Sequence, residues 1–69
     1  MDVKVGDKIR ILYMQGEPQY AYKEGYVRLI DDAGQIHGSW GGCAIVPEFD
    51  QYEIIEQVKD SFYKGKENL

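Results

Sequence analysis

Short runs of apolar residues, separated by glycine and aspartate, recur roughly every eight to twelve positions along the chain. In the first run, the side chains of Ile9, Ile11 and Tyr13 alternate with their neighbours, which is the period of a β-strand with one buried face. Glycine and aspartate at the breaks favour turns. The pattern predicts an all-β domain with five strands, at Lys8–Met14, Tyr26–Ile30, Gln35–Trp40, Cys43–Val46 and Tyr52–Glu56.

Two turns set the predicted register of the middle strands. Asp31–Gly34 is predicted to form a four-residue loop, because Gly34 adopts positive φ readily. Gly41-Gly42 predicts a two-residue hairpin turn. In this register the apolar face, which becomes the predicted core, consists of Val27, Leu29, Ile36, Trp40, Cys43 and Ile45. The polar face, on which Arg28 lies opposite His37, consists of Tyr26, Arg28, Gln35, His37 and Ser39.

Residues 1–56 are predicted to form one domain, a five-stranded SH3-like β-barrel, because this is an economical closure for five short strands. An open meander that dimerises through an edge strand is the alternative. Residues 57–69 are predicted to form a charged tail, which is either frayed or folded into one or two helical turns. Helical turns are considered because Ile55, Val58 and Phe62 have helical spacing.

Composition and charge exclude several classes of protein. The 69 residues (7.9 kDa) suffice for one domain. The single cysteine, Cys43, rules out an intrachain disulfide, and one histidine with one cysteine argues against a zinc site, so no cofactor is expected. No apolar run approaches the roughly 20 residues of a membrane span. Met1–Asp7 lacks the apolar stretch of a signal peptide, and we therefore expect a cytoplasmic protein without membrane contact.

The residues that could support catalysis are not placed together by the pattern. Cys43 and His37 fall on opposite faces, so a Cys–His pair is not expected. Ser39 and His37 share a face but lie about 7 Å apart, and no carboxylate is placed by the sequence to orient the histidine. Asp31 and Asp32 are expected to form turn hydrogen bonds, with a weak divalent-ion site as the alternative. We therefore expect a protein that is not an enzyme.

The candidate binding residues are mainly tyrosines, of which the chain has six. Tyr20 and Tyr22 lie in a predicted loop, where they either pack over the barrel end or contact a partner. Because the net charge is −4 and tyrosine is favoured at interfaces, a protein partner is expected. The alternative is RNA, single-stranded DNA or a nucleotide, bound by Tyr26, Arg28 and His37 on the polar face. Assembly of several copies is a third hypothesis.

Two resemblances add to this interpretation. The run Val5–Ile11 (VGDKIRI), followed by Lys23–Val27 (KEGYV) and Ile30-Asp31, resembles the opening of KOW-type and other translation-associated SH3-like barrels. A wider match, over about residues 3–55, joins the segments GDKIRI, EGYV, IDDAGQIHGSWGG, AIVP and YEII. This match is similar to a family of very small proteins that are encoded by bacteria, phages and other mobile elements. The family is known only as a domain of unknown function. This resemblance implies an SH3-like fold and an accessory protein of a phage or mobile element that modulates a host factor.

Overall fold

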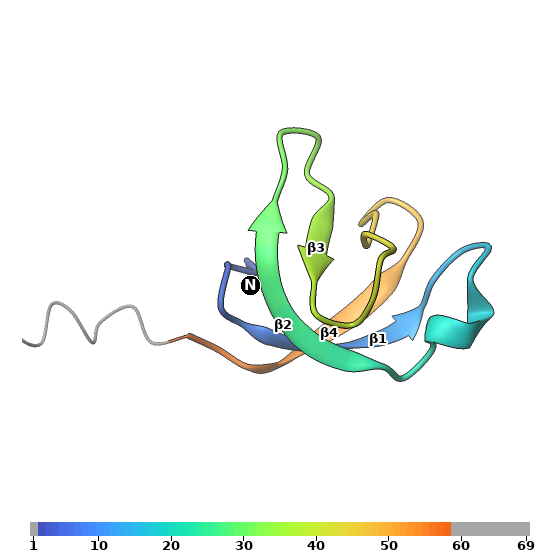
Figure 1. Cartoon of the computed structure of the whole chain (residues 1–69), viewed down its shortest axis with the longest axis horizontal. Coiled ribbons are helices and arrows are strands. Elements are labelled where there is room, and N and C mark those ends of the chain that lie inside the picture. Colours follow the sequence, from blue (N-terminus) through green and yellow to red (C-terminus); the bar gives the residue numbers. More distant parts are fainter. Residues whose placement is uncertain (1, 59–69) are drawn as a thin grey trace, which may run out of the picture.

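The computed structural model describes residues 2–58. They form one antiparallel sheet in the order β3-β2-β1-β4 (Figure 1). The strands are β1 (Lys8–Tyr13), β2 (Glu24–Ile30), β3 (Ile36–Gly38) and β4 (Gln51–Glu56). One short 3-10 helix, η1 (Pro18–Tyr20), lies in the β1–β2 connection, and no α-helix occurs within residues 2–58. The predicted all-β class is confirmed, whereas residues 59–69 of the predicted tail lie outside the described residues.

The predicted strand Cys43–Val46 is reduced to a single bridge between Ile36 and Ile45. Two backbone hydrogen bonds form this bridge, one from the Ile36 amide to the Ile45 carbonyl (2.9 Å) and one from the Ile45 amide to the Ile36 carbonyl (2.8 Å). At the other side of the sheet, β1 pairs with β4. Residues 2–58 therefore form an open four-stranded sheet, and neither the fifth strand nor closure of the barrel is confirmed.

The loop that follows β3 differs from the predicted Gly41-Gly42 hairpin. That hairpin would pair Ile45 with Gly38, and this prediction is wrong because Ile45 pairs with Ile36. The Trp40 indole turns inward and donates a hydrogen bond from Nε1 to the carbonyl of Cys43 (2.8 Å). The chain therefore folds around the indole instead of reversing at two glycines.

A β-bulge in β2 shifts the second half of this strand by one position relative to the prediction. Val27 pairs with Gly38 as predicted, and the pairs that follow are Leu29 with His37 and Ile30 with Ile36. Leu29 is consequently 53% exposed, and Ile30 packs against the core in its place. The predictions of Leu29 in the core and of Arg28 opposite His37 are wrong, because two residues of β2 oppose one residue of β3 at the bulge.

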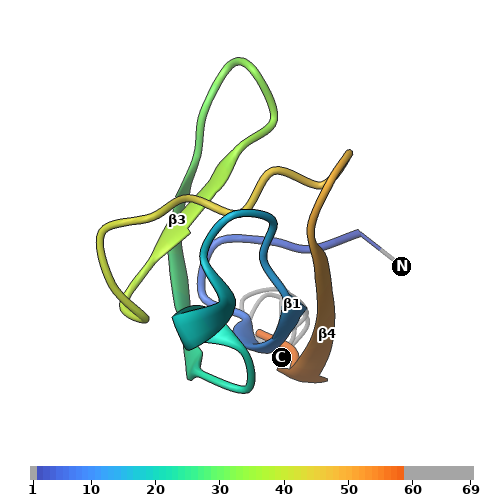
Figure 2. The same ribbon diagram turned by 90° about the vertical axis from the view of Figure 1, so that its right-hand side faces the viewer.

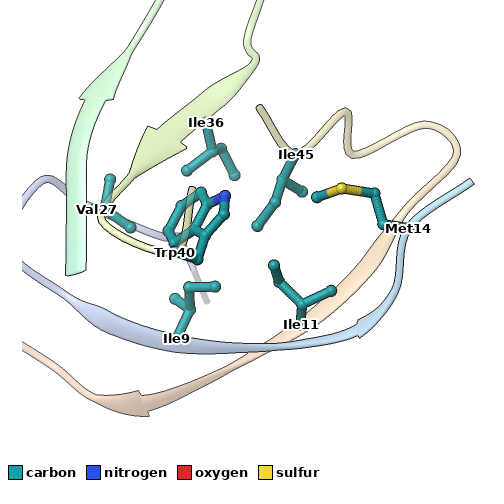
Figure 3. Close-up of a cluster of buried hydrophobic side chains, with 7 residues drawn as sticks. All are labelled: Ile9, Ile11, Met14, Val27, Ile36, Trp40 and Ile45. Carbon is teal, nitrogen blue, oxygen red and sulfur yellow. The ribbon is translucent and has the colours of Figure 1, made fainter. Parts of the chain in front are cut away.

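The sheet is curved (Figure 2), and the core side chains lie on its concave side (Figure 3). The core consists of Ile9, Ile11, Met14, Val27, Ile36, Trp40 and Ile45, with Trp40 among the other six (Figure 3). The prediction that Trp40 packs in the core is confirmed. Glycine leaves room for the indole, since a Cβ on Gly38 would lie 2.5 Å from Trp40 Cη2 and a Cβ on Gly25 would lie 3.1 Å from Trp40 Cε3. The alternation of β1 thus supplies one wall of the core, and glycines in β2 and β3 admit its largest member.

A buried aspartate joins the two ends of the described chain. Asp7, which follows a turn at Gly6, is fully buried. Its Oδ2 accepts a hydrogen bond from the Lys4 amide (2.8 Å), and its Oδ1 accepts one from the Val58 amide (2.7 Å). Because both oxygens meet backbone donors, the cost of burying the carboxylate is offset. The Gly-Asp pair therefore holds the chain that leaves β4 against the turn that precedes β1.

Candidate functional site

The outer face of β2, β1 and β4 carries a charged network centred on Arg10. Its Nη2 lies 2.8 Å from Glu24 Oε2, and its Nη1 lies 2.8 Å from Glu53 Oε2, so one guanidinium connects three strands. Hydrogen bonds with Glu24 and with Glu53 raise the pKa of Arg10. Lys8 Nζ lies 3.9 Å from Glu24 Oε1 and 5.7 Å from the centre of the Tyr26 ring. The cations next to the predicted nucleic-acid face are therefore paired with carboxylates.

The predicted trio Tyr26, Arg28 and His37 is only partly brought together. Tyr26 is 46% exposed and pairs across the sheet with Lys8. Arg28 is exposed at the bulge, and it forms no ion pair with any of residues 2–58. His37 lies across from Leu29 and is half-buried. This face therefore presents one aromatic ring and one cation without an ion pair among residues 2–58, and Leu29 takes the position opposite the histidine that was predicted for Arg28.

Asp31 is a partner of His37 that the sequence interpretation missed. Its Oδ1 accepts hydrogen bonds from the amides of Ala33 (3.0 Å) and Gln35 (2.9 Å), which confirms the predicted role in the turn. Its Oδ2 lies 2.9 Å from His37 Nε2, so the fold brings to the histidine a carboxylate that the sequence pattern did not place there. The hydrogen bond with His37 is the main cause that lowers the pKa of Asp31. Ser39 is engaged elsewhere, since its Oγ accepts a hydrogen bond from the Tyr26 amide (2.9 Å).

Tyr20, at the end of η1, packs against the core and the loop after β3. A Cβ on Gly41 would lie 2.7 Å from the Tyr20 hydroxyl oxygen, so this loop approaches the ring closely. A hydrogen bond with the Cys43 side chain is the main cause that raises the pKa of Tyr20, and desolvation adds to it. Lys23 Nζ lies 5.7 Å from the ring centre. Tyr20 thus contributes to packing between the β1–β2 connection and the loop at residues 40–43.

Tyr22 lies two residues after Tyr20 and has a different environment. It is 72% exposed and has a φ of 68°, which is the only positive φ of a non-glycine residue in residues 2–58. The Tyr22 amide donates a hydrogen bond to the Ile11 carbonyl (2.6 Å), and this bond holds the chain in its turn beside β1. The backbone of Tyr22 is therefore fixed, while its ring extends into solvent.

Two further exposed aromatic residues, Tyr13 and Phe49, were not among the predicted site residues. Phe49 lies in the turn before β4 and is 57% exposed, and Tyr13 lies at the end of β1.

Asp50 holds the segment after β1 and the turn before β4 together, because its Oδ1 accepts a hydrogen bond from the Gln15 amide (2.9 Å) and its Oδ2 accepts one from the Val46 amide (2.7 Å). The sequence signal was an aspartate at the end of a turn, but it did not indicate which segments the carboxylate joins.

Other kinds of site receive no support from the described residues. No three of their His, Cys, Asp and Glu side chains are grouped so that they could hold a metal ion, and the surface of this part has no pocket. None of its helices is long and apolar enough to cross a membrane. Comparisons of the chain with protein-family models, with curated proteins and with solved structures find no match. The family therefore remains a prediction from the sequence motifs.

Proposed function

We propose that this chain is a non-enzymatic binding module of SH3-like architecture and that its partner is a protein. The strand order and the pairing of β1 with β4 support this architecture. The bridge at Ile45 supports it further, because it sets the Ile45 backbone beside β3, where the next strand of such a barrel would lie. In this proposal the sheet is a rigid support, and loops with exposed aromatic side chains contact the partner.

Tyr22 is the observation that carries the proposal of a protein partner. A left-handed backbone costs a residue with a Cβ about 1 to 2 kcal/mol, and glycine avoids this cost. The ring recovers little of this energy in the folded chain, because it is 72% exposed. Backbone strain of this kind is concentrated at functional positions, and tyrosine is enriched among the residues that dominate binding energy at protein interfaces. Tyr22 is therefore proposed as the anchor of the interface.

The charge distribution favours a protein over a nucleic acid. The net charge is −4, and Lys8 and Arg10 are paired with Glu24 and Glu53. Affinity for nucleic acids depends on cations that are free to neutralise phosphates. Binding of RNA, single-stranded DNA or a nucleotide at Tyr26, Arg28 and His37 is kept as the alternative, because Arg28 is exposed and has no ion pair within residues 2–58.

The motifs of residues 3–55 supply the proposed biological setting. They resemble small proteins of bacteria, phages and other mobile elements, and on that basis the partner would be a host protein of the cytoplasm. Neither the partner nor the setting affects the physical argument about Tyr22, which depends only on its backbone and its exposure.

The test compares capture of proteins from an extract of the source cells by the wild-type chain and by variants. Tyr22→Gly should lower the amount of its specific partner at least about tenfold, as expected for an anchor residue. Tyr22→Phe keeps the ring and should retain the partner, and Tyr26→Ala changes an exposed tyrosine on another face and should also retain it. Equal capture by the wild type and Tyr22→Gly would contradict the proposal.

A titration with mixed-sequence RNA and single-stranded DNA tests the alternative. Salt-sensitive NMR shifts confined to Tyr26, Arg28, His37 and their neighbours would support nucleic-acid binding. We expect the spectrum to remain unchanged at both low and near-physiological salt.

A further inference from the structure

The strand β4 is an open edge of the sheet. It pairs with β1 on one side, and no strand within residues 2–58 pairs with its other side. An open edge presents backbone donors and acceptors that can pair with an added strand. The strand is six residues long, and its pairing with β1 is continuous over Tyr52–Ile54, between two register shifts, so this stretch is the part of the edge that an extended peptide can pair with.

The register identifies the backbone groups that face this edge. The amide and carbonyl of Ile11 both bond to the β1–β2 connection, at Lys23 and Tyr22 respectively. Because backbone groups alternate in direction along a strand, those of Arg10 point the other way, towards Glu53 on β4. The groups of Glu53 therefore face β1. The backbone amides and carbonyls of the two neighbouring residues, Tyr52 and Ile54, therefore face outward, away from β1.

The side chains of Tyr52 and Ile54 complete a surface that an added strand would cover. Both are partly buried and lie at the border of the core. Burial, together with the nearby carboxylates of Asp2 and Asp7, raises the pKa of Tyr52. The edge therefore combines outward backbone groups, incompletely covered apolar side chains and negative charge.

The charge of this half of the molecule indicates the chemistry of the occupant. Residues 29–58, which include β3, the following loop and β4, contain six carboxylates and no lysine or arginine. Glu48, in the turn before β4, and Glu56, at the end of β4, are exposed, whereas Glu53 is paired with Arg10. A second copy would bring two such acidic segments together, whereas a basic partner would meet opposite charge.

We propose that the open edge of β4 binds an extended, basic segment of a protein partner, which adds to the sheet as a further strand. This inference rests on the proposed function and goes beyond it, because it adds a second contact surface on the other side of β1 from Tyr22 and names the chemistry of the partner. Backbone hydrogen bonds at Tyr52 and Ile54 supply the pairing, and the exposed carboxylates of Glu48 and Glu56 select lysine and arginine side chains. The apolar side chains of the added strand cover Tyr52 and Ile54.

The first experiment measures amide hydrogen exchange of the full chain by NMR, with and without a synthetic peptide of alternating lysine and valine. In the free protein the amides of Tyr52 and Ile54 should exchange much faster than that of Glu53. The peptide should slow both at least about tenfold, and added salt should weaken this effect. A peptide of alternating glutamate and valine is the control and should have no effect.

Three results would overturn the inference. One is slow exchange at Tyr52 and Ile54 in the free protein, which would mean that the edge is already covered. Another is a free protein with twice the mass of the chain in light scattering, with these amides protected, which would assign the edge to a second copy. The third is unchanged exchange in the presence of the basic peptide.

Matched variants separate the edge from general damage to the fold. Ile54→Ala and Ile54→Pro both remove the side chain, but only the proline removes the amide that faces the edge, and proline is tolerated at such positions. The proline variant should bind the basic peptide about tenfold more weakly than the alanine variant. If it does not fold, Glu56→Lys should weaken binding severalfold and Asp32→Lys, the same charge change in the distant β2–β3 loop, should not.

The same variants distinguish failure of this inference from failure of the proposed function. The edge is excluded as a binding site if Ile54→Pro and Ile54→Ala bind the basic peptide equally. If Tyr22→Gly loses the cellular partner in the same series, the proposed function still stands. If Tyr22→Gly still captures the cellular partner, the proposed role of Tyr22 as the anchor is contradicted, whatever the peptide result.

Discussion

Replacement of Gly38 by alanine is expected to be among the most damaging single-methyl changes in this fold. A Cβ at this position would lie 2.5 Å from the Tyr26 carbonyl oxygen and 2.5 Å from Trp40 Cη2. The carbonyl is held by the Ser39 amide (3.1 Å), and the indole is enclosed by the core, so neither can move away cheaply. Overpacking costs about 1 to 3 kcal/mol, and we expect a value near the upper end. A domain of this size has roughly 3 to 9 kcal/mol of stability in total.

Urea unfolding, followed by the fluorescence of Trp40, measures this loss directly, because the chain has one tryptophan. Gly42→Ala is the matched control. A Cβ on Gly42 meets nothing within 4 Å, and its φ is not positive, so its cost should stay within about 0.5 kcal/mol. If Gly38→Ala and Gly42→Ala have the same free energy of unfolding, the described packing around Trp40 is wrong.

Three further predictions test the polar contacts. Asp50→Ala leaves two backbone amides without their acceptor and should lower the free energy of unfolding by about 2 to 4 kcal/mol in urea titrations, and a loss under about 1 kcal/mol would argue against these bonds. Arg10→Met should lower the free energy of unfolding only slightly, and less at high salt, because the ion pairs are exposed to solvent; Arg28→Met, which removes no ion pair within residues 2–58, should have no measurable effect. Because the folded pKa of Asp31 lies below its ordinary value of 3.8, its stabilisation is complete above about pH 5 and is lost as the pH falls through the folded pKa. His37→Ala should reduce that acid dependence of unfolding, and an unchanged pH profile would contradict the pairing.

The sequence predicted the class of the fold because apolar alternation and turn residues are local signals. Strands near β1, β2 and β4 follow from alternation and spacing, and the central position of Trp40 follows from its side of the sheet. The bulge in β2 could not be predicted in this way. Leu29 and Ile30 are both apolar, so either register buries one of them, and the choice depends on the neighbouring strand.

The candidate site was predicted less completely, because its features depend on contacts between distant segments. Tyr22 was identified as a candidate because it lies in a predicted loop. Whether its ring packs over the end of the sheet could be decided only from the structure, where the ring is exposed and the backbone has a positive φ. Asp31 was assigned to the turn correctly, yet its bond to His37 requires the closed hairpin. The pairing of Arg10 with Glu53 joins residues that are far apart in the chain, and alternation alone carries no information about it.

The most direct test of the central claim measures stability and partner capture on the same Tyr22→Gly protein. If Tyr22 is retained for binding and not for folding, glycine should raise the free energy of unfolding by about 1 kcal/mol, because it relieves the left-handed strain, and the partner should be lost. A variant that is less stable than the wild type would contradict the strain. A variant that still captures the same partner would contradict the role of Tyr22 as the anchor.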